Sequence, residues 1–438
     1  MRRRSTAAGW ATLVAATLAG SLVATPAEAA LVSGAPVPGS AARSTAPAAA
    51  AASAVQTLSP TDRRIDAKLT VRATAKALGR DLTGLVTDAR SGQQLWSQAR
   101  RTRQLPASTT KLVTAVNALE TFGPGHRITT RVRKGSTWRR VVLVGAGDPS
   151  LSRPAMKVLA AATAKAVRAR GVRRVTVQVD DSLFPRPSRA YGWRSSYMPT
   201  DVSPVRALVV SQHRRWDTSI DAGKVFAELL GSYGVRTRAV VRGRAAAGAP
   251  VLASVKGRRM HRMIASMLLP SDNDYAEVLH RLVALRVGRP ATWSGAAAAQ
   301  RQVLAGLGVD LGTSRLYDGS GLSRADRLTA AQLTAVLSLA LDGDHPRLAS
   351  LPDSLPVAGR SGTLARNYLR YTTWPSRCAV GLIEAKTGSL SGVITLAGYA
   401  RGADGRTKAF AFLANGVPST LTTRRAVDKL ASTITGCW

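Results

Sequence analysis

A serine and a lysine stand three residues apart in the stretch LPASTTKLVTAVNALETFG, residues 105–123. The stretch has the signals of an amphipathic helix, with Pro106 in the first turn and Gly123 at the stop. Residues three apart share a helix face, so the Ser108 hydroxyl and the Lys111 amine should lie within reach of each other. Burial favours a neutral amine, which can take the serine proton. Chance produces this spacing often, and a capping serine beside a solvated lysine is the simpler interpretation.

A second stretch, MLLPSDNDYAEVLHRLV at residues 267–283, places Ser271, Asp272 and Asn273 between an apolar run and a helical pattern. Serine, aspartate and asparagine are preferred helix N-caps, so this stretch alone predicts only the start of a helix.

A third stretch, CAVGLIEAKTGSLSGVITLAGYAR at residues 378–401, carries Lys386, Thr387 and Gly388 after a short apolar run. We expect an apolar strand that includes 380–383 and ends in Lys-Thr-Gly, followed by a turn at 389–392 and a second strand at 393–397. A cation, a hydroxyl and an open backbone edge suit a peptide that lies along a sheet with its carboxylate held by the lysine and the threonine. An edge-strand lysine that prevents aggregation is the alternative.

The three motifs occur in the order Ser-x-x-Lys, Ser-x-Asn, Lys-Thr-Gly, which is the set found in penicillin-binding proteins and class A β-lactamases. More narrowly, the sequence resembles the D-alanyl-D-alanine carboxypeptidase/endopeptidase family, which includes low-molecular-mass class C penicillin-binding proteins. The resemblance also rests on GAGDPSL at 145–151 and YDGSGLSRADRLTAAQL at 317–333. It covers most of the chain after residue 60.

The resemblance implies a serine D-Ala-D-Ala carboxypeptidase that acts on peptidoglycan stem peptides through an acyl-enzyme, with DD-endopeptidase action as a second activity. It implies no cofactor and no metal, and β-lactams as covalent inhibitors. A non-catalytic wall-binding protein that retains the fold is the alternative, although decay would strike Ser108 or Lys111 first.

Residue roles follow from the same resemblance. Ser108 would be the nucleophile and Lys111 its base. Ser271 would relay the proton to the leaving nitrogen. Asn273 would bind the substrate backbone, and Lys386 and Thr387 the terminal carboxylate. The backbone N–H groups of Ser108 and Ser389 would form the oxyanion hole. Residues that would reach the distal groups of diaminopimelate are Arg324 and either Asp180 or Asp181.

A β-lactamase is excluded by the positions of the glutamates. Class A enzymes hydrolyse their acyl-enzyme with a glutamate-activated water from a loop between Ser-x-Asn and Lys-Thr-Gly. No glutamate occurs between Glu277 and Glu384, so the adduct with penicillin should be long-lived. About 160 residues separate Lys111 from Ser271, which is room for an inserted domain.

The predicted fold is α+β: a penicillin-binding-protein/β-lactamase-like catalytic domain, with an antiparallel sheet flanked by helices, built from residues 60–121 and 252–438. Residues 122–251 contain strand-like and helical patterns and are expected to form a smaller inserted α+β domain. In the resembled family a third domain often interrupts the second, and here the sequence runs directly across that point.

The chain begins with a basic segment, an apolar segment and an Ala-Glu-Ala cleavage signal, which predict a secretory signal peptide over 1–29. An uncleaved membrane anchor is the alternative. Residues 30–59 are rich in Ala, Pro and Ser and predict a disordered linker. Export to the cell wall, the periplasmic space or the medium also favours a disulfide between the two cysteines, Cys378 and Cys437. Neither cysteines nor histidines show metal-ligand spacing.

The formal net charge is +37, which invites a nucleic-acid interpretation. Arginines are spread along the whole chain, however, and export would separate the protein from intracellular nucleic acid. Attraction to anionic wall polymers or to anionic lipid is the functional alternative, and a GC-rich genome is the non-functional one.

Overall fold

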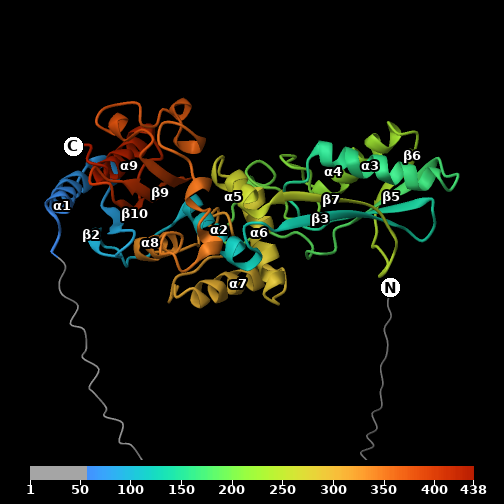
Figure 1. Cartoon of the computed structure of the whole chain (residues 1–438), viewed down its shortest axis with the longest axis horizontal. Coiled ribbons are helices and arrows are strands. Elements are labelled where there is room, and N and C mark those ends of the chain that lie inside the picture. Colours follow the sequence, from blue (N-terminus) through green and yellow to red (C-terminus); the bar gives the residue numbers. More distant parts are fainter. Residues whose placement is uncertain (1–56) are drawn as a thin grey trace, which may run out of the picture. The chain divides into compact units, whose positions relative to one another are not determined.

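The computed structural model describes residues 57–438, and the predicted signal peptide (1–29) and residues 30–56 of the predicted linker lie outside the described residues. Figure 1 shows two sheets in the described part. The first sheet is antiparallel throughout, in the order β2-β1-β10-β9-β8. Its strands are β1 (Asp81–Asp88), β2 (Gln94–Gln98), β8 (Ile383–Leu390), β9 (Val393–Arg401) and β10 (Thr407–Asn415).

Helices cover both faces of the first sheet because its central strands are apolar on both sides. In β10, Phe410 and Phe412 belong to the core shared with α1 (Pro60–Ala73) and α9 (Leu421–Ile434). The alternating residues Ala409, Ala411 and Leu413 belong to the core on the opposite face. Helices that contribute to this second core are α2 (Thr110–Phe122), α5 (Met260–Leu268), α6 (Asn273–Arg286), α7 (Trp293–Gly306) and α8 (Ala330–Ser338). This arrangement confirms the predicted fold class.

The second sheet has the order β6-β5-β4-β3-β7 and mixes parallel and antiparallel pairs. Strands β4, β5 and β6 are parallel, and α3 (Arg153–Arg168) and α4 (Thr218–Gly231) connect them in sequence. The strands are β3 (Arg127–Lys134), β4 (Arg140–Val144), β5 (Arg174–Asp180), β6 (Arg236–Arg242) and β7 (Val251–Arg259). The sequence analysis ended the inserted segment at residue 251, but β7 pairs with β3, so the second sheet continues to Arg259.

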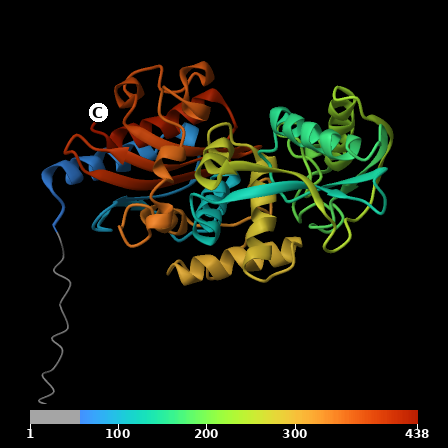
Figure 2. The same ribbon diagram turned by 45° about the vertical axis from the view of Figure 1, so that its right-hand side comes forward.

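A long irregular segment connects β5 to α4 and packs against the catalytic helices. Its side chains Phe184, Trp193, Val202 and Val205 are buried in the same core as α2 and α6. The segment therefore joins the core of the first sheet's helices to the inserted sequence (Figure 2). Among the described residues, no helix combines the length and the hydropathy that a membrane span requires.

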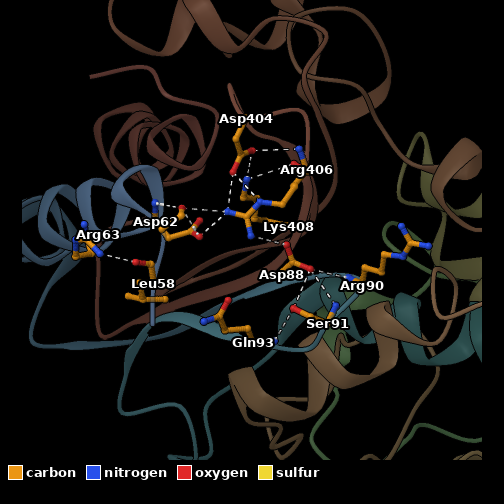
Figure 3. Close-up of polar contacts among 11 residues, drawn as sticks. Leu58, Asp62, Arg63, Asp88, Arg90, Ser91, Gln93, Asp404, Arg406 and Lys408 are labelled. Carbon is orange, nitrogen blue, oxygen red and sulfur yellow. Dashed lines mark hydrogen bonds and ion pairs between the residues drawn. The ribbon is translucent and has the colours of Figure 1, made fainter. Parts of the chain in front are cut away.

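An arginine bridges three carboxylates where α1 meets the first sheet (Figure 3). The Arg406 guanidinium lies 2.5 Å from Asp62 of α1, 3.1 Å from Asp88 at the end of β1 and 2.8 Å from Asp404 in the β9–β10 turn. The buried amine of Lys408 also contacts Asp404. Asp62 is 1% exposed, so its charge is neutralised by this contact rather than by water. The network fixes α1 against the sheet.

A disulfide joins Cys378 to Cys437, as the sequence predicted. Cys378 lies in a short 3-10 helix before β8, and Cys437 follows α9. The bond therefore ties the end of the chain to the segment that leads into the Lys-Thr-Gly strand.

Replacing both cysteines with serine should lower the free energy of unfolding by about 4 kcal/mol, because the bond closes a loop with a sequence separation of 59. Urea unfolding of the two proteins measures this difference. Reductant should reproduce the loss in the unmodified protein and leave the double variant unchanged. Equal unfolding midpoints for the two proteins would refute the stabilising role.

Candidate active site

Ser108 lies in the first turn of a continuous helical segment that begins as a 3-10 helix at Ala107–Thr109 and continues as α2. This agrees with the predicted helix, and Gly123 ends it with a φ of +79°. The N–H groups of a helix's first turn have no partner within the helix, and they favour negative charge. Ser108 therefore occupies a position that stabilises an alkoxide or an oxyanion.

Two glycines allow other segments to approach the backbone just before Ser108. A Cβ atom on Gly321 would lie 1.9 Å from the carbonyl oxygen of Ala107, and one on Gly388 would lie 2.9 Å from the carbonyl oxygen of Pro106. The Thr395 hydroxyl of β9 also donates a hydrogen bond to the Pro106 carbonyl, at 2.9 Å. The turn that presents Ser108 is thus held between the 317–333 motif and the Lys-Thr-Gly hairpin.

The Lys111 amine is completely buried and has three acceptors. Its Nζ donates to Ser108 Oγ at 3.0 Å, to Asn273 Oδ1 at 2.7 Å and to the Ser320 carbonyl at 2.8 Å. Burial lowers the pKa of Lys111 from 10.5 to about 8, against the opposing charges of Asp318 and Glu277. A neutral amine within hydrogen-bond distance of a serine hydroxyl can serve as its base.

The two opposing carboxylates organise the 317–333 motif around Lys111. Glu277 accepts the N–H groups of Gly319 and Ser320, at 3.1 and 2.8 Å. Burial and the charge of Asp318 raise the pKa of Glu277 to about 8. Neither acid was predicted from the sequence as a site residue. Glu277 lies four residues after Asn273, one helical turn along α6, and that spacing was the available signal.

The Ser-x-Asn motif lies where the sequence placed it, at the start of α6. Asp272 caps the helix by accepting the Tyr275 N–H, and Ser271 has a left-handed backbone with φ +64°. Ser271 lines the same cavity as Ser108. Both polar atoms of the Asn273 amide form hydrogen bonds. Its Oδ1 accepts from Lys111, and its Nδ2 donates to the Asp201 carbonyl at 2.9 Å.

The Lys-Thr-Gly residues lie inside β8, the edge strand of the first sheet. The predicted strand that carries Lys-Thr-Gly and the turn after it are present with shifted bounds: the strand runs from Ile383 to Leu390, and Ser391 and Gly392 alone connect it to β9. The Ala385 N–H points away from β9, because it donates to the Pro356 carbonyl at 2.9 Å. Backbone N–H groups two residues apart point to the same edge, so those of Thr387 and Ser389 also face the free edge.

A cavity of about 230 Å³ connects these motifs. Its lining residues are Ser108, Ser271, Thr363, Tyr368, Arg370, Thr387, Gly388, Ser389, Ile394, Thr395 and Arg424. The sequence analysis did not single out Thr363, Arg370 or Arg424, which come from segments without a recognisable motif. The Thr363 hydroxyl lies 2.7 Å from the Thr387 hydroxyl.

Cations gather at one wall of this cavity. The buried Lys386 amine donates to the Thr387 carbonyl at 2.6 Å. Burial and the positive charges of Lys111 and Arg370 hold the pKa of Lys386 well below its usual range. Arg370 makes a two-pronged ion pair with the buried Asp428, at 2.5 and 2.7 Å. An anion bound here would meet a preorganised positive field.

The two residues predicted to reach diaminopimelate have different surroundings. Arg324 Nη1 donates to the Ser391 carbonyl at 3.1 Å, which places it beside the β8–β9 turn. Asp180 instead accepts from Ser182 and from the Ala245 N–H at the end of β5. Asp181 pairs with Arg206 and Arg242. Both acids are engaged within the inserted sequence and neither lines the Ser108 cavity, so their positions do not support the predicted contact.

Comparisons with known proteins agree with this geometry. The sequence profile of the D-Ala-D-Ala carboxypeptidase 3 (S13) family matches residues 65–215 and 199–434. The chain belongs to this family. A carboxypeptidase of Mycobacterium tuberculosis is 36% identical over 399 residues, covering 86% of this chain and 85% of that protein. A D-alanyl-D-alanine carboxypeptidase of Actinomadura is 30% identical and covers 76% of this chain and 77% of its own length.

Solved structures show the same fold. Penicillin-binding protein 4 of Haemophilus influenzae superimposes with a TM-score of 0.71 at 21% identity, over 84% of this chain and 98% of that one. A structure of that protein in complex with a β-lactam gives a TM-score of 0.62 at 20% identity, over the same shares. The chain described here is accordingly a serine D-Ala-D-Ala carboxypeptidase of the S13 family. Within residues 57–438, no group of three or more acids, histidines and cysteines is arranged to hold a metal ion.

Gly321→Ala should slow acylation of the enzyme by a fluorescent penicillin by at least about tenfold, since a 1.9 Å contact with the Ala107 carbonyl displaces the turn that carries Ser108. Stopped-flow labelling measures the rate. Gly308→Ala is the matched control, because Gly308 has a similar φ of +77° and no atom within 4 Å of the added Cβ. Equal acylation rates in Gly321→Ala and Gly308→Ala would show that the contact with the Ala107 carbonyl does not control acylation.

Proposed function

We propose that the enzyme cleaves the terminal D-Ala-D-Ala bond of peptidoglycan stem peptides, with Ser108 as nucleophile and Lys111 as its base. The observation that carries this proposal is the buried Lys111 amine, 3.0 Å from Ser108 Oγ. As Ser108 Oγ attacks the carbonyl carbon of the penultimate D-alanine, its proton moves to Lys111 Nζ.

The negative charge that develops on the carbonyl oxygen is held by backbone N–H groups. The Ser108 N–H in the first helical turn and the Ser389 N–H on the free edge of β8 are the two donors. When the tetrahedral intermediate collapses, the C–N bond breaks, Ser271 gives its hydroxyl proton to the nitrogen of the departing D-alanine, and Ser271 regains a proton from Lys111 Nζ. Asn273 holds Lys111 in place and contacts the substrate backbone. Water then hydrolyses the acyl-enzyme and restores Ser108.

The cationic wall of the cavity binds the substrate's terminal carboxylate. Burial disfavours the charged form of Lys386 in the free enzyme, and the negative charge of the bound carboxylate favours it again. The hydroxyls of Thr387 and Thr363 supply hydrogen bonds. Arg370, fixed by Asp428, adds a second cation that sequence motifs do not reveal. Arg324, beside the β8–β9 turn, serves the distal part of the stem peptide. DD-endopeptidase action uses the same groups, because the bond cleaved in a cross-link also follows a D-alanine.

β-Lactams enter the same site as covalent inhibitors. The Haemophilus protein of the same fold is known in complex with a β-lactam. Since no glutamate occurs between Glu277 and Glu384, the enzyme lacks the residue with which class A β-lactamases activate water, and the penicilloyl adduct persists. This chemistry places the enzyme outside the cytoplasm, consistent with its disulfide and with the signal-like residues 1–29.

Retention at the wall by charge is a second property that we propose. The formal net charge of +37 attracts anionic wall polymers without any part in hydrolysis. A protein that bound the wall and did not hydrolyse would have no need of a desolvated lysine beside a serine, so catalysis remains the primary proposal.

A fluorescent penicillin should label the protein once, at Ser108, and the purified enzyme should release D-alanine from pentapeptide muropeptides. Mass spectrometry of the labelled tryptic peptide and of the muropeptides measures both. Ser108→Ala should abolish both signals. Lys111→Ala should acylate about 10²–10⁴ times more slowly, the usual contribution of a positioned base.

Ser97→Ala, an exposed serine on β2, is the control and should behave as the unmodified protein. Labelling that persists in Ser108→Ala would contradict the proposed role of Ser108 as nucleophile. Labelling without muropeptide cleavage would support the non-catalytic alternative.

A further inference from the structure

A second cavity, of about 590 Å³, lies in the inserted sequence and shares no residue with the Ser108 cavity. It is bounded by the loop before α3, the first turn of α3, the end of β7 and the start of α5. Figure 1 shows β7 leading directly into α5. No step of the proposed reaction uses this cavity.

The cavity is lined by five exposed cations, namely Arg127, Lys256, Arg258, Arg259 and Arg262. None of the five forms an ion pair with a carboxylate in the part of the chain that the structure describes. Two make hydrogen bonds to neutral groups, Arg127 to the Gly257 carbonyl and Arg258 to the Ser266 hydroxyl. Their charges therefore remain available to a ligand.

The sequence concentrates these charges at one point. Residues 256–262, KGRRMHR, contain four Lys or Arg residues and a histidine, which is the density typical of sites for anionic polysaccharides and nucleic acids. The run crosses from β7 into α5, and the cations of both elements still line one cavity. Residues 168–174, RARGVRR, are equally basic, so the run at 256–262 is distinguished by the cavity that its side chains line and not by its density of charge.

The single acid in the lining, Asp148, takes part in building the cavity through one carboxylate oxygen, while its Oδ2 has no hydrogen-bond partner among the described residues. It is 3% exposed, and its Oδ1 accepts from the Ser150 N–H and hydroxyl, at 2.9 and 2.6 Å. The Ser150 hydroxyl in turn accepts the Arg258 N–H at 3.0 Å. A Cβ atom on Gly257 would lie 2.2 Å from Asp148 Oδ2, so the loop fits against β7 only because this residue is a glycine. The GAGDPSL motif thus joins the loop to the cationic strand.

The helix that opens into the cavity adds to the positive field. α3 has 16 residues, its first turn contains no acid, and Ser152 and Ala155 of that turn line the cavity. Helix N-termini favour anions because their N–H groups and their dipole face outward. The five cationic side chains and the N-terminus of α3 therefore both favour an anion in the cavity.

We propose that this cavity binds phosphodiester groups of an anionic cell-wall polymer and so holds the enzyme beside its substrate. The location of the partner rests on the proposed function, because an enzyme that cleaves stem peptides works within the wall. A membrane surface fits less well. None of the exposed large apolar side chains among residues 57–438 lines the cavity, and interfacial binding depends on apolar burial as well as charge.

The test measures binding of the full chain to a fluorescent oligo(glycerol phosphate) at low and moderate salt. The cavity variant Lys256→Gln/Arg259→Gln/Arg262→Gln removes three charges whose side chains make no hydrogen bond within residues 57–438. It should bind at least about tenfold more weakly, with a shallower dependence of affinity on salt. The matched variant Arg174→Gln/Arg236→Gln/Arg238→Gln removes three exposed charges from β5 and β6 and should bind as the unmodified chain does.

Equal loss in the two variants, or no binding by the unmodified chain, would overturn the proposal and leave only a diffuse polycation. Cavity-dependent binding to phosphatidylglycerol vesicles without binding to the soluble oligomer would overturn it in favour of a membrane. Hydrolysis of a soluble D-Ala-D-Ala peptide should be unchanged in both variants, which shows that they are folded. That readout also separates failure of this proposal from failure of the catalytic one.

Discussion

Burial of the Lys111 amine is the constraint on which the rest of the site depends. A lysine removed from water favours its neutral form, and the pKa of Lys111 falls to about 8. The buried carboxylates of Glu277 and Asp318 oppose this shift, so the pKa is set by a balance and not by burial alone. Three oxygens surround the amine. In the neutral form its two N–H groups can donate to Asn273 Oδ1 and the Ser320 carbonyl, which leaves the lone pair for the Ser108 proton.

The fold keeps this amine buried because it brings segments that are distant in sequence together at the start of the helix that carries Ser108. The first sheet offers its edge strand β8, the 317–333 motif supplies the Ser320 carbonyl, and α6 supplies Asn273. Close approach requires glycine at two points, since side chains at Gly321 or Gly388 would collide with the backbone before Ser108. Close approach also requires a glycine in the cationic cavity, where a side chain at Gly257 would collide with Asp148. The proposed catalysis and the proposed wall binding then depend on separate cavities of one chain.

Much of this site could be predicted because its motifs are local in sequence. Ser108 and Lys111 share a helix face, and the caps at Ser271–Asn273 and the strand at Lys386 follow from residue type and period. Contacts between segments that are distant in sequence could not be predicted from residue type and spacing. Arg370 enters the cavity from an irregular segment, and only the fold shows that Asp428 of α9 holds it. The contact predicted for Asp180 or Asp181 stays a prediction, and the hydrogen bonds that Asp180 makes at the end of β5 do not support it. The end of the inserted sequence was misplaced, since strand pairing and not composition decides where β7 belongs.

The central claim is tested most directly by the pH dependence of acylation by a fluorescent penicillin. If neutral Lys111 is the base, the second-order rate should rise about tenfold per pH unit up to about pH 8 and then level off. Glu277 also has a pKa of about 8, so the limb must disappear in Lys111→Ala to be assigned to the lysine. A rate that is flat through pH 8, or one that keeps rising toward the ordinary lysine value of 10.5, would contradict the account.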